Sequence, residues 1–206
     1  MTTLFKILSI SFTLFLLMDS LGNVPIFIAI LKKFDANTQK KIIRRELLIA
    51  LGIILSFHFF GKFLLDLIQV KQETILIAGG IILFLISLQM IFPSVSSENS
   101  PNPLFHGNPF IVPLAIPLLA GPAVLAAVML YSDQENLLIT IPAIILAWLA
   151  STAVLTSSTF LKKLLGEQGL LACEKLMGLL LTLIAIQMCL KGVNMYAVEL
   201  KKLLAG

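Results

Sequence analysis

Residues 74–92 read Thr-Ile-Leu-Ile-Ala-Gly-Gly-Ile-Ile-Leu-Phe-Leu-Ile-Ser-Leu-Gln-Met-Ile-Phe. This run of 19 residues contains no charged side chain. As a helix it would be about 29 Å long, which matches the roughly 30 Å hydrocarbon core of a bilayer. A soluble domain rarely surrounds so long an apolar helix on every side, whereas lipid does. The run therefore predicts a transmembrane helix.

The rest of the 206-residue chain repeats this pattern. Hydrophobic residues make up 58% of it and charged residues 13%, against roughly 45–50% and about 25% in soluble domains. The sequence lacks the alternating segments of membrane β-barrels, so the spans should be helical. We predict an all-α membrane protein with six transmembrane helices, over residues 7–31, 47–65, 74–92, 109–130, 138–161 and 170–192.

The charges indicate how the chain is oriented. Its net charge of +4 would by itself fit nucleic-acid binding. However, six of the fifteen basic residues lie within residues 32–45, between the first two spans. Basic residues gather in loops on the cytoplasmic side of membranes. We therefore predict a cytoplasmic loop there, no nucleic-acid partner, and both termini in the periplasm.

Residues 80–90 and 178–188 are similar to each other at a spacing of 98 residues. Six of the eleven positions are identical, and the glycine and Gln-Met matches carry the most weight because apolar residues match readily by chance. The identical pairs are Gly80/Gly178, Leu83/Leu181, Leu85/Leu183, Ile86/Ile184, Gln89/Gln187 and Met90/Met188. The similarity indicates two copies of one unit.

A second, weaker match places Pro25 and Pro122 at a spacing of 97 residues. Each unit would then hold three helices, in residues 1–95 and 109–206, joined by a loop rich in Pro, Ser and Asn at 96–108. Because three is an odd number, the second unit must enter the membrane from the opposite side. The chain is thus predicted to be an inverted-topology repeat, an arrangement found in many secondary transporters.

The first helix of each unit should be broken. Gly22 and Asn23 precede Pro25, and Gly121 precedes Pro122. Proline removes a backbone donor, and irregular backbone at membrane depth must be sheltered from lipid. A break also creates a helix N-terminus, capped here by Asn23, that suits a carboxylate. Two ordinary proline kinks are the alternative interpretation.

Three polar side chains complete the candidate site. Asp19 lies midway along the first span, where a carboxylate costs about 2.5–3.5 kcal/mol to insert and is a functional hypothesis by default. It would bind an amine or cation, carry a proton, or cap the break. Gln89 and Gln187 lie on the third helix of each unit and would contact either a substrate or a neighbouring helix.

Other polar residues have structural explanations. His58 is expected to be packed and neutral, and Lys62 to pair with Asp66 four residues away. Ala143, Ala147 and Ser151 form a small-residue stripe for helix packing. No phosphate-binding loop, nucleophile elbow or metal-ligand spacing is present in the sequence, so we expect neither an enzyme nor a cofactor.

Together the motifs resemble the MarC family of membrane proteins, also grouped as neutral amino acid transporter-like. The resemblance spans nearly the whole chain and is carried by 19–25, by 77–80 with Gln89 and Met90, by 117–122, and by 175–178 with Gln187 and Gly192. It implies six helices in the bacterial inner membrane and, for some members, transport of small neutral amino acids.

The predicted function is therefore secondary transport of a small zwitterionic solute, bound at mid-membrane breaks by Asp19, Gly22, Asn23, Pro25, Gly121, Pro122, Gln89 and Gln187. A proton or a sodium ion would be the coupling ion. The sequence leaves open an exporter of another metabolite or drug, and a membrane partner protein that transports nothing. It sets no oligomeric state.

Overall fold

The computed structural model describes residues 2–31, 35–92 and 119–204 of the chain. Within these residues the backbone is helical and contains no strand. The helices are α1 (Thr2–Leu17), α2 (Val24–Leu31), α3 (Ala36–Leu67), α4 (Gln72–Ile91), α5 (Pro122–Gln134), α6 (Leu137–Thr156) and α7 (Ser158–Leu204). The prediction of an all-α protein is confirmed.

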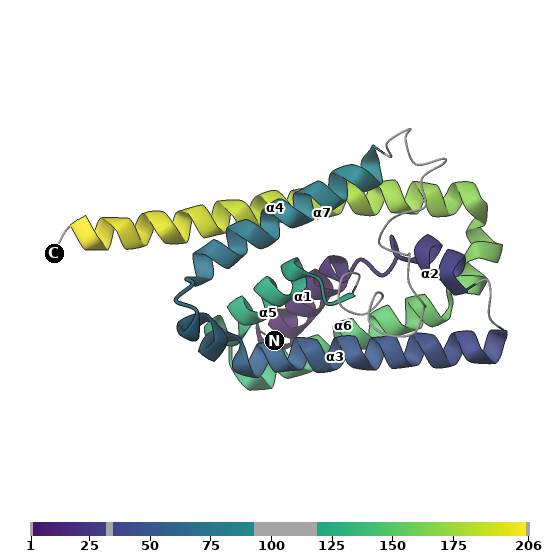
Figure 1. Cartoon of the computed structure of the whole chain (residues 1–206), viewed down its shortest axis with the longest axis horizontal. Helices are drawn as coiled ribbons and strands as arrows, with labels where there is room; N and C mark the ends of the chain where they lie inside the picture. The colour runs from purple at the N-terminus through teal and green to yellow at the C-terminus, as the bar shows by residue number, and fades with distance from the viewer. Residues whose placement is uncertain (1, 32–34, 93–118, 205–206) are drawn as a thin grey trace.

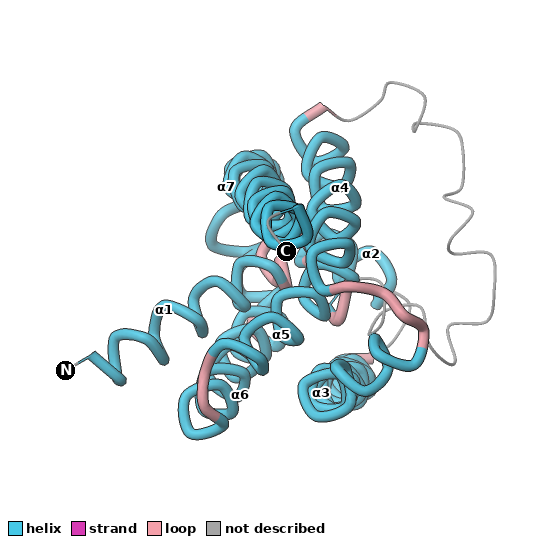
Figure 2. The backbone as a smooth tube through the Cα atoms, turned by 90° about the vertical axis from the view of Figure 1, so that its left-hand side faces the viewer, coloured by secondary structure: helices cyan, strands magenta, loops and turns pink. Residues whose placement is uncertain are grey.

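The long helices run along the long axis of the molecule (Figure 1). α4 packs along α7, and α3 and α6 lie on the other side of the bundle, with α1 and α5 between the two layers (Figure 2). α1 packs mainly on α6, and α5 packs on both α3 and α4. The result is a bundle with two ends. The α2 end holds α2 and the start of α3, and the α3–α4 end holds the turn between α3 and α4.

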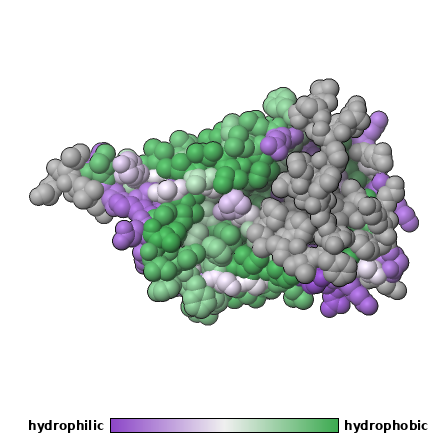
Figure 3. Space-filling model, in the orientation of Figure 1, coloured by the Kyte–Doolittle hydropathy of each residue, from purple (hydrophilic) through white to green (hydrophobic). Residues whose placement is uncertain are grey.

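The middle of the molecular surface is apolar. Figure 3 shows hydrophobic residues over the central part of the visible face and hydrophilic residues toward the two ends. Large side chains such as Phe60 and Phe63 of α3 are 67% and 69% exposed, as expected for side chains that face lipid. Among the described residues, four helical segments are long and apolar enough to cross a membrane: Thr38–Leu67, Gln72–Ile91, Leu137–Thr156 and Gln168–Lys201.

The remaining two predicted spans are incomplete in the described residues. The span predicted at 7–31 is divided into α1 and α2 by residues 18–23, so its predicted interruption is confirmed. Of the span predicted at 109–130, the structure describes Leu119 onward, and α5 begins at Pro122. The predicted loop at 96–108 lies outside the described residues.

Two predicted loops prove to be helical. α3 begins at Ala36, so Lys40, Lys41, Arg44 and Arg45 lie on its first turns and not in a loop. With 32 residues α3 is about 48 Å long, so its basic turns extend beyond the hydrocarbon layer. Residues 162–169 likewise belong to α7, but Gly166, with φ 68° and ψ −178°, is not helical and separates the two helical parts of α7 within the predicted connection. That left-handed conformation suits glycine, and it turns the chain sharply.

Small residues set the helix packing. The predicted stripe of Ala143, Ala147 and Ser151 is buried, and the Ser151 hydroxyl contacts Met18 Sδ at 3.5 Å. The indole N–H of Trp148 donates to the Leu47 carbonyl at 2.8 Å and ties α6 to α3. Close contacts with backbone provide most of the adhesion available to helices that lipid surrounds.

Candidate functional site

The interruption between α1 and α2 is organised by Asp19. Its φ of 45° is in the left-handed region, which Asp tolerates better than most residues. One carboxylate oxygen, Oδ1, accepts the Gly22 N–H at 3.3 Å, and the Asp19 carbonyl accepts the Asn23 N–H at 3.0 Å. The capping role considered for Asp19 is therefore present. The second oxygen, Oδ2, accepts no hydrogen bond from the residues that the structure describes.

Asn23 and Pro25 shape the start of α2. The Asn23 carbonyl accepts the Phe27 N–H at 3.0 Å, so Asn23 occupies the capping position. Its side chain, however, donates back to the Met18 carbonyl at 3.3 Å. Because Pro25 has no N–H and the Val24 N–H bonds to Leu21, the start of α2 offers few donors to an anion. Ser20 is fully buried, and its hydroxyl makes no hydrogen bond to the residues that the structure describes.

A cavity of about 240 Å³ adjoins α2 at the α2 end of the bundle. Its charged lining residues are Lys162, before the bend in α7, and Glu174, after it. Pro25 and Ile28 of α2 form another wall. Glu174 is half-buried and lies within electrostatic range of Asp19. One carboxylate and one ammonium group thus line a space suited to a small solute, and Asp19, which does not line it, lies within electrostatic range of Glu174.

The second predicted break is also a helix start. Gly121 has φ −66° and ψ 165° and precedes Pro122, the first residue of α5. Proline suits this position because its fixed φ is already helical. Leu125 is the first residue of this helix whose N–H is bonded to a carbonyl one turn back, that of Gly121. The N–H groups of the first turn of α5 have no acceptor within the helix itself.

Both breaks pack against α4, at different turns of it. A Cβ placed on Gly22 would overlap Met90 Cε, whereas a Cβ on Gly79 would lie 3.5 Å from the Cα of Ala123 in α5. Gly79 and Met90 are about 16 Å apart by helical rise. The contacts therefore bring the two breaks to one helix but not to one point along it.

Gln89 and Gln187 lie elsewhere. Both side chains are exposed on the outer surface of the α4–α7 pair. Neither lines the cavity beside α2. Their neighbours in sequence, Met90 and Met188, are the residues that face the interior. In both copies of the repeat, the methionine of the Gln-Met pair faces the interior and the glutamine faces outward.

The structure also decides two smaller predictions. His58 is buried and lies 3.2 Å from the Thr140 hydroxyl, as expected for a packed histidine. The predicted Lys62–Asp66 pair is wrong, because Lys62 Nζ bonds to Asp133 Oδ1 of α5 at 3.0 Å. Sequence reasoning missed Glu174, although a carboxylate within the predicted span 170–192 is the same signal that selected Asp19.

Comparisons with known proteins agree with the membrane architecture. The family model described as MarC family integral membrane protein matches residues 4–197. The UPF0056 inner membrane protein YhgN of Escherichia coli strain K12 is 46% identical over 193 residues, 93% of this chain and 98% of that protein. A UPF0056 membrane protein of Buchnera aphidicola subsp. Baizongia pistaciae is 44% identical over 192 residues, 92% of this chain and 96% of its own length.

A more distant relative, a UPF0056 membrane protein of Chlamydia pneumoniae, is 34% identical over 190 residues, 91% of this chain and 94% of that protein. No solved structure matches the chain. The similarity covers both halves of the sequence and every helix described above. The chain belongs to the MarC family of integral membrane proteins.

Proposed function

We propose that this protein is a secondary transporter of small neutral amino acids in the bacterial inner membrane. The observation that carries the proposal is the interruption of the first span, where a carboxylate and irregular backbone are sheltered inside the bundle. The helix that follows the interruption, α2, lines a cavity. Such backbone is tolerated at membrane depth only where protein or water covers it. The naming of YhgN as an inner membrane protein supports the location.

The charges around the cavity fit a zwitterion. The carboxylates of Asp19 and Glu174 would hold an ammonium group, and Lys162 would hold a carboxylate. Asp19 Oδ2 makes no hydrogen bond to the described residues, so it can accept from the solute while Oδ1 keeps the break capped. A proton or a sodium ion would neutralise the remaining carboxylate when the solute has left.

An inverted repeat of two three-helix units would supply the two access states. Two contacts support it. Gly80 faces the Ala185 carbonyl, and Gly178 faces the Ser87 carbonyl. Gly178 follows Gly80 by 98 residues, and Ala185 follows Ser87 by the same interval, so the two contacts are equivalent in the repeat. The helix pairs are reciprocal too. α2 packs on α7 as α5 packs on α4, and α2 contacts α6 as α5 contacts α3. Gly121 and Pro122 mark the position equivalent to the first break.

The proposed topology has both termini in the periplasm. Lys6 pairs with Glu135 at the turn between α5 and α6, and Lys71 pairs with Glu199 near the end of α7. These pairs support a location of both termini at the α3–α4 end. The basic turns of α3 and residues Lys162 and Lys163 belong to the opposite, α2 end, which is therefore proposed to be cytoplasmic.

The test is uptake of labelled glycine and alanine by liposomes that contain the purified protein, under an imposed proton or sodium gradient. The unaltered protein should accumulate at least one of them. Asp19→Asn should lower the initial rate by about tenfold or more, because it removes a charge-assisted contact worth about 1.5–3 kcal/mol. Glu135→Gln, an acidic residue outside the cavity, is the matched control and should leave uptake unchanged.

Two outcomes would count against the proposal. Absence of exchange across a panel of neutral amino acids, with correctly inserted protein, would remove the assigned substrate class. Equal uptake by Asp19→Asn and by the unaltered protein would remove Asp19 from the mechanism.

A further inference from the structure

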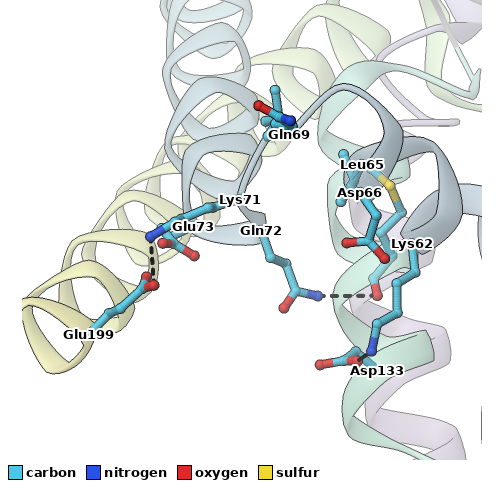
Figure 4. Close-up of a pocket in the computed structure, with 11 residues that line it drawn as sticks. Lys62, Leu65, Asp66, Gln69, Lys71, Gln72, Glu73, Asp133 and Glu199 are labelled. Atoms are coloured by element: carbon cyan, nitrogen blue, oxygen red, sulfur yellow. Dashed lines mark hydrogen bonds and ion pairs between the residues drawn. The ribbon is translucent and has the colours of Figure 1, made fainter. Parts of the chain in front are cut away.

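A second and larger cavity lies at the opposite end of the bundle from the Asp19 break. It has a volume of about 480 Å³ and lies where α3 ends, α4 begins and α5 ends (Figure 4). The turn between α3 and α4 closes one side, with Gln69 in a left-handed conformation at φ 54°. Glu199 of α7 completes the lining. The cavity is formed by segments far apart in the sequence.

The lining of this cavity carries an excess of negative charge. It includes two lysines, Lys62 and Lys71, and four acidic residues. Each lysine is already paired, Lys62 with Asp133 at 3.0 Å and Lys71 with Glu199 at 2.6 Å. The hydrogen bond to Glu199 raises the pKa of Lys71, so this ammonium group stays charged throughout the neutral range. The charges of Asp66 and Glu73 remain in excess.

Glu73 is the unusual member of this set. It is only 7% exposed, and its Oε1 is buried and makes no hydrogen bond to any of the described residues. Figure 4 shows its carboxylate beside the Lys71–Glu199 pair. The backbone of Glu73 has little freedom, because its carbonyl lies 2.9 Å from the place where a Cβ on Gly192 would be. A buried oxygen left without a donor is costly, so a ligand that supplies an N–H would be favoured there.

The two cavities occupy equivalent places in the repeated sequence. Gln72 and Glu73 line the larger one, and Leu170 and Leu171, 98 residues later, line the smaller one beside α2. The first adjoins α5 and the second adjoins α2, the corresponding helix of the other half. The chemistry differs between them, because Glu73 corresponds to an apolar residue. The larger cavity is therefore a site in its own right.

We propose that the cavity at the α3–α4 end binds the ammonium group of a small solute, with Glu73 accepting its N–H and Asp66 supplying additional negative charge. Binding here does not require that the protein transports the solute. A primary ammonium fits better than a metal ion, since within the described residues no group of three or more His, Cys, Asp or Glu side chains is placed to hold one. A quaternary ammonium has no N–H for Oε1.

The test is equilibrium binding of labelled methylammonium to the full-length protein in detergent micelles. The unaltered protein should bind it, and Glu73→Gln should weaken binding about tenfold or more, because a charged acceptor is lost. Asp66→Asn should weaken it less, since Asp66 is exposed. Glu135→Gln, whose carboxylate pairs with Lys6 outside the cavity, should bind as the unaltered protein does. Tetramethylammonium should compete poorly.

A second measurement covers the case in which Glu73→Gln does not fold. In a protein that carries Cys173→Ala, Cys189→Ala and Gln72→Cys, methylammonium should slow modification of the new thiol by a maleimide. Equal modification rates with and without methylammonium would overturn the proposal. So would equal affinity of Glu73→Gln and the unaltered protein, or full competition by sodium at the same concentration.

The outcomes also separate this proposal from the transport proposal. Methylammonium binding that depends on Glu73, without uptake of glycine or alanine, would support this site and remove the transporter. Uptake that depends on Asp19, without any methylammonium binding, would support the transporter and remove this site.

Discussion

At the scale of single residues, Asp19 and Gly22 depend on each other. The carboxylate of Asp19 folds back over Gly22, so that a Cβ at position 22 would lie 2.5 and 2.6 Å from its two oxygens. No real Cβ contact is that short, so the absence of a side chain at Gly22 is what allows Asp19 to cap the break. The motif 19–25 therefore functions as a unit and not as separate residues.

Replacement of Gly22 by alanine should displace the Asp19 carboxylate. We expect Gly22→Ala to lower the free energy of unfolding by about 1–3 kcal/mol, as overpacking of a buried site typically does, and to lower glycine uptake as Asp19→Asn does. Thermal unfolding in detergent and liposome uptake measure the two effects. Gly52→Ala is the control, because a Cβ there meets nothing within 4 Å. If the two variants behave alike, Gly22 has no special role.

At the scale of elements, the α4–α7 pair forms the most extensive contact among the described helices. The Ser87 and Thr182 hydroxyls hydrogen-bond across it at 2.8 Å, and glycines of both helices permit close approach. The two glycines of the sequence repeat are not equally crowded. A Cβ on Gly80 would lie 2.6 Å from Cys189 Sγ and 2.9 Å from the Ala185 carbonyl oxygen, whereas a Cβ on Gly178 would have no contact shorter than 3.0 Å.

This difference predicts unequal effects of the same substitution. Gly80→Ala should lower the stability of the protein by about 1–3 kcal/mol, because backbone of α7 must move. Gly178→Ala should be close to neutral. Its nearest neighbours, which include the Ser87 carbonyl, need move only slightly, and the cost of that shift is offset by a gain in helix propensity of about 1 kcal/mol. Thermal unfolding of both variants in the same detergent compares them. A larger loss in Gly178→Ala would show that the α4–α7 spacing described here is wrong.

At the scale of the whole molecule, the ion pairs and the basic turns separate the two ends. Lys6–Glu135, Lys62–Asp133 and Lys71–Glu199 join different helices at the α3–α4 end. Exposed pairs of this kind contribute little to stability, so they indicate how the ends are arranged more than they stabilise them. The proposed orientation has this end in the periplasm.

Cysteine labelling tests that orientation. The chain has only two cysteines, Cys173 and Cys189, so a cysteine-free protein needs only Cys173→Ala and Cys189→Ala. In that background, Asn136→Cys should react with a membrane-impermeant maleimide in spheroplasts, and Lys163→Cys should react only after the membrane is permeabilised. The opposite pattern would reverse the proposed topology, and reaction of both thiols from outside would contradict the separation of the two ends.

The sequence by itself determined the class of the protein, most of the apolar helices and the interruption of the first span. These features follow from local rules. Long apolar helices are the stable form of the chain in lipid, and residues 22–25 disfavour a regular helix because of their own backbone preferences. It also determined that Asp19 lies at that interruption, where its neighbours in sequence supply the N–H groups that it caps.

Only the tertiary structure decided which side chains meet. Lys62 pairs with Asp133 and not with Asp66, Glu174 approaches Asp19, and Gln89 and Gln187 face outward. Helix boundaries also changed, because lengths such as that of α3 depend on which turns extend beyond the hydrocarbon. Partners of this kind come from helices far apart in the chain, and their rotation about their own axes is set by packing against neighbours, which sequence periodicity in an apolar helix does not encode.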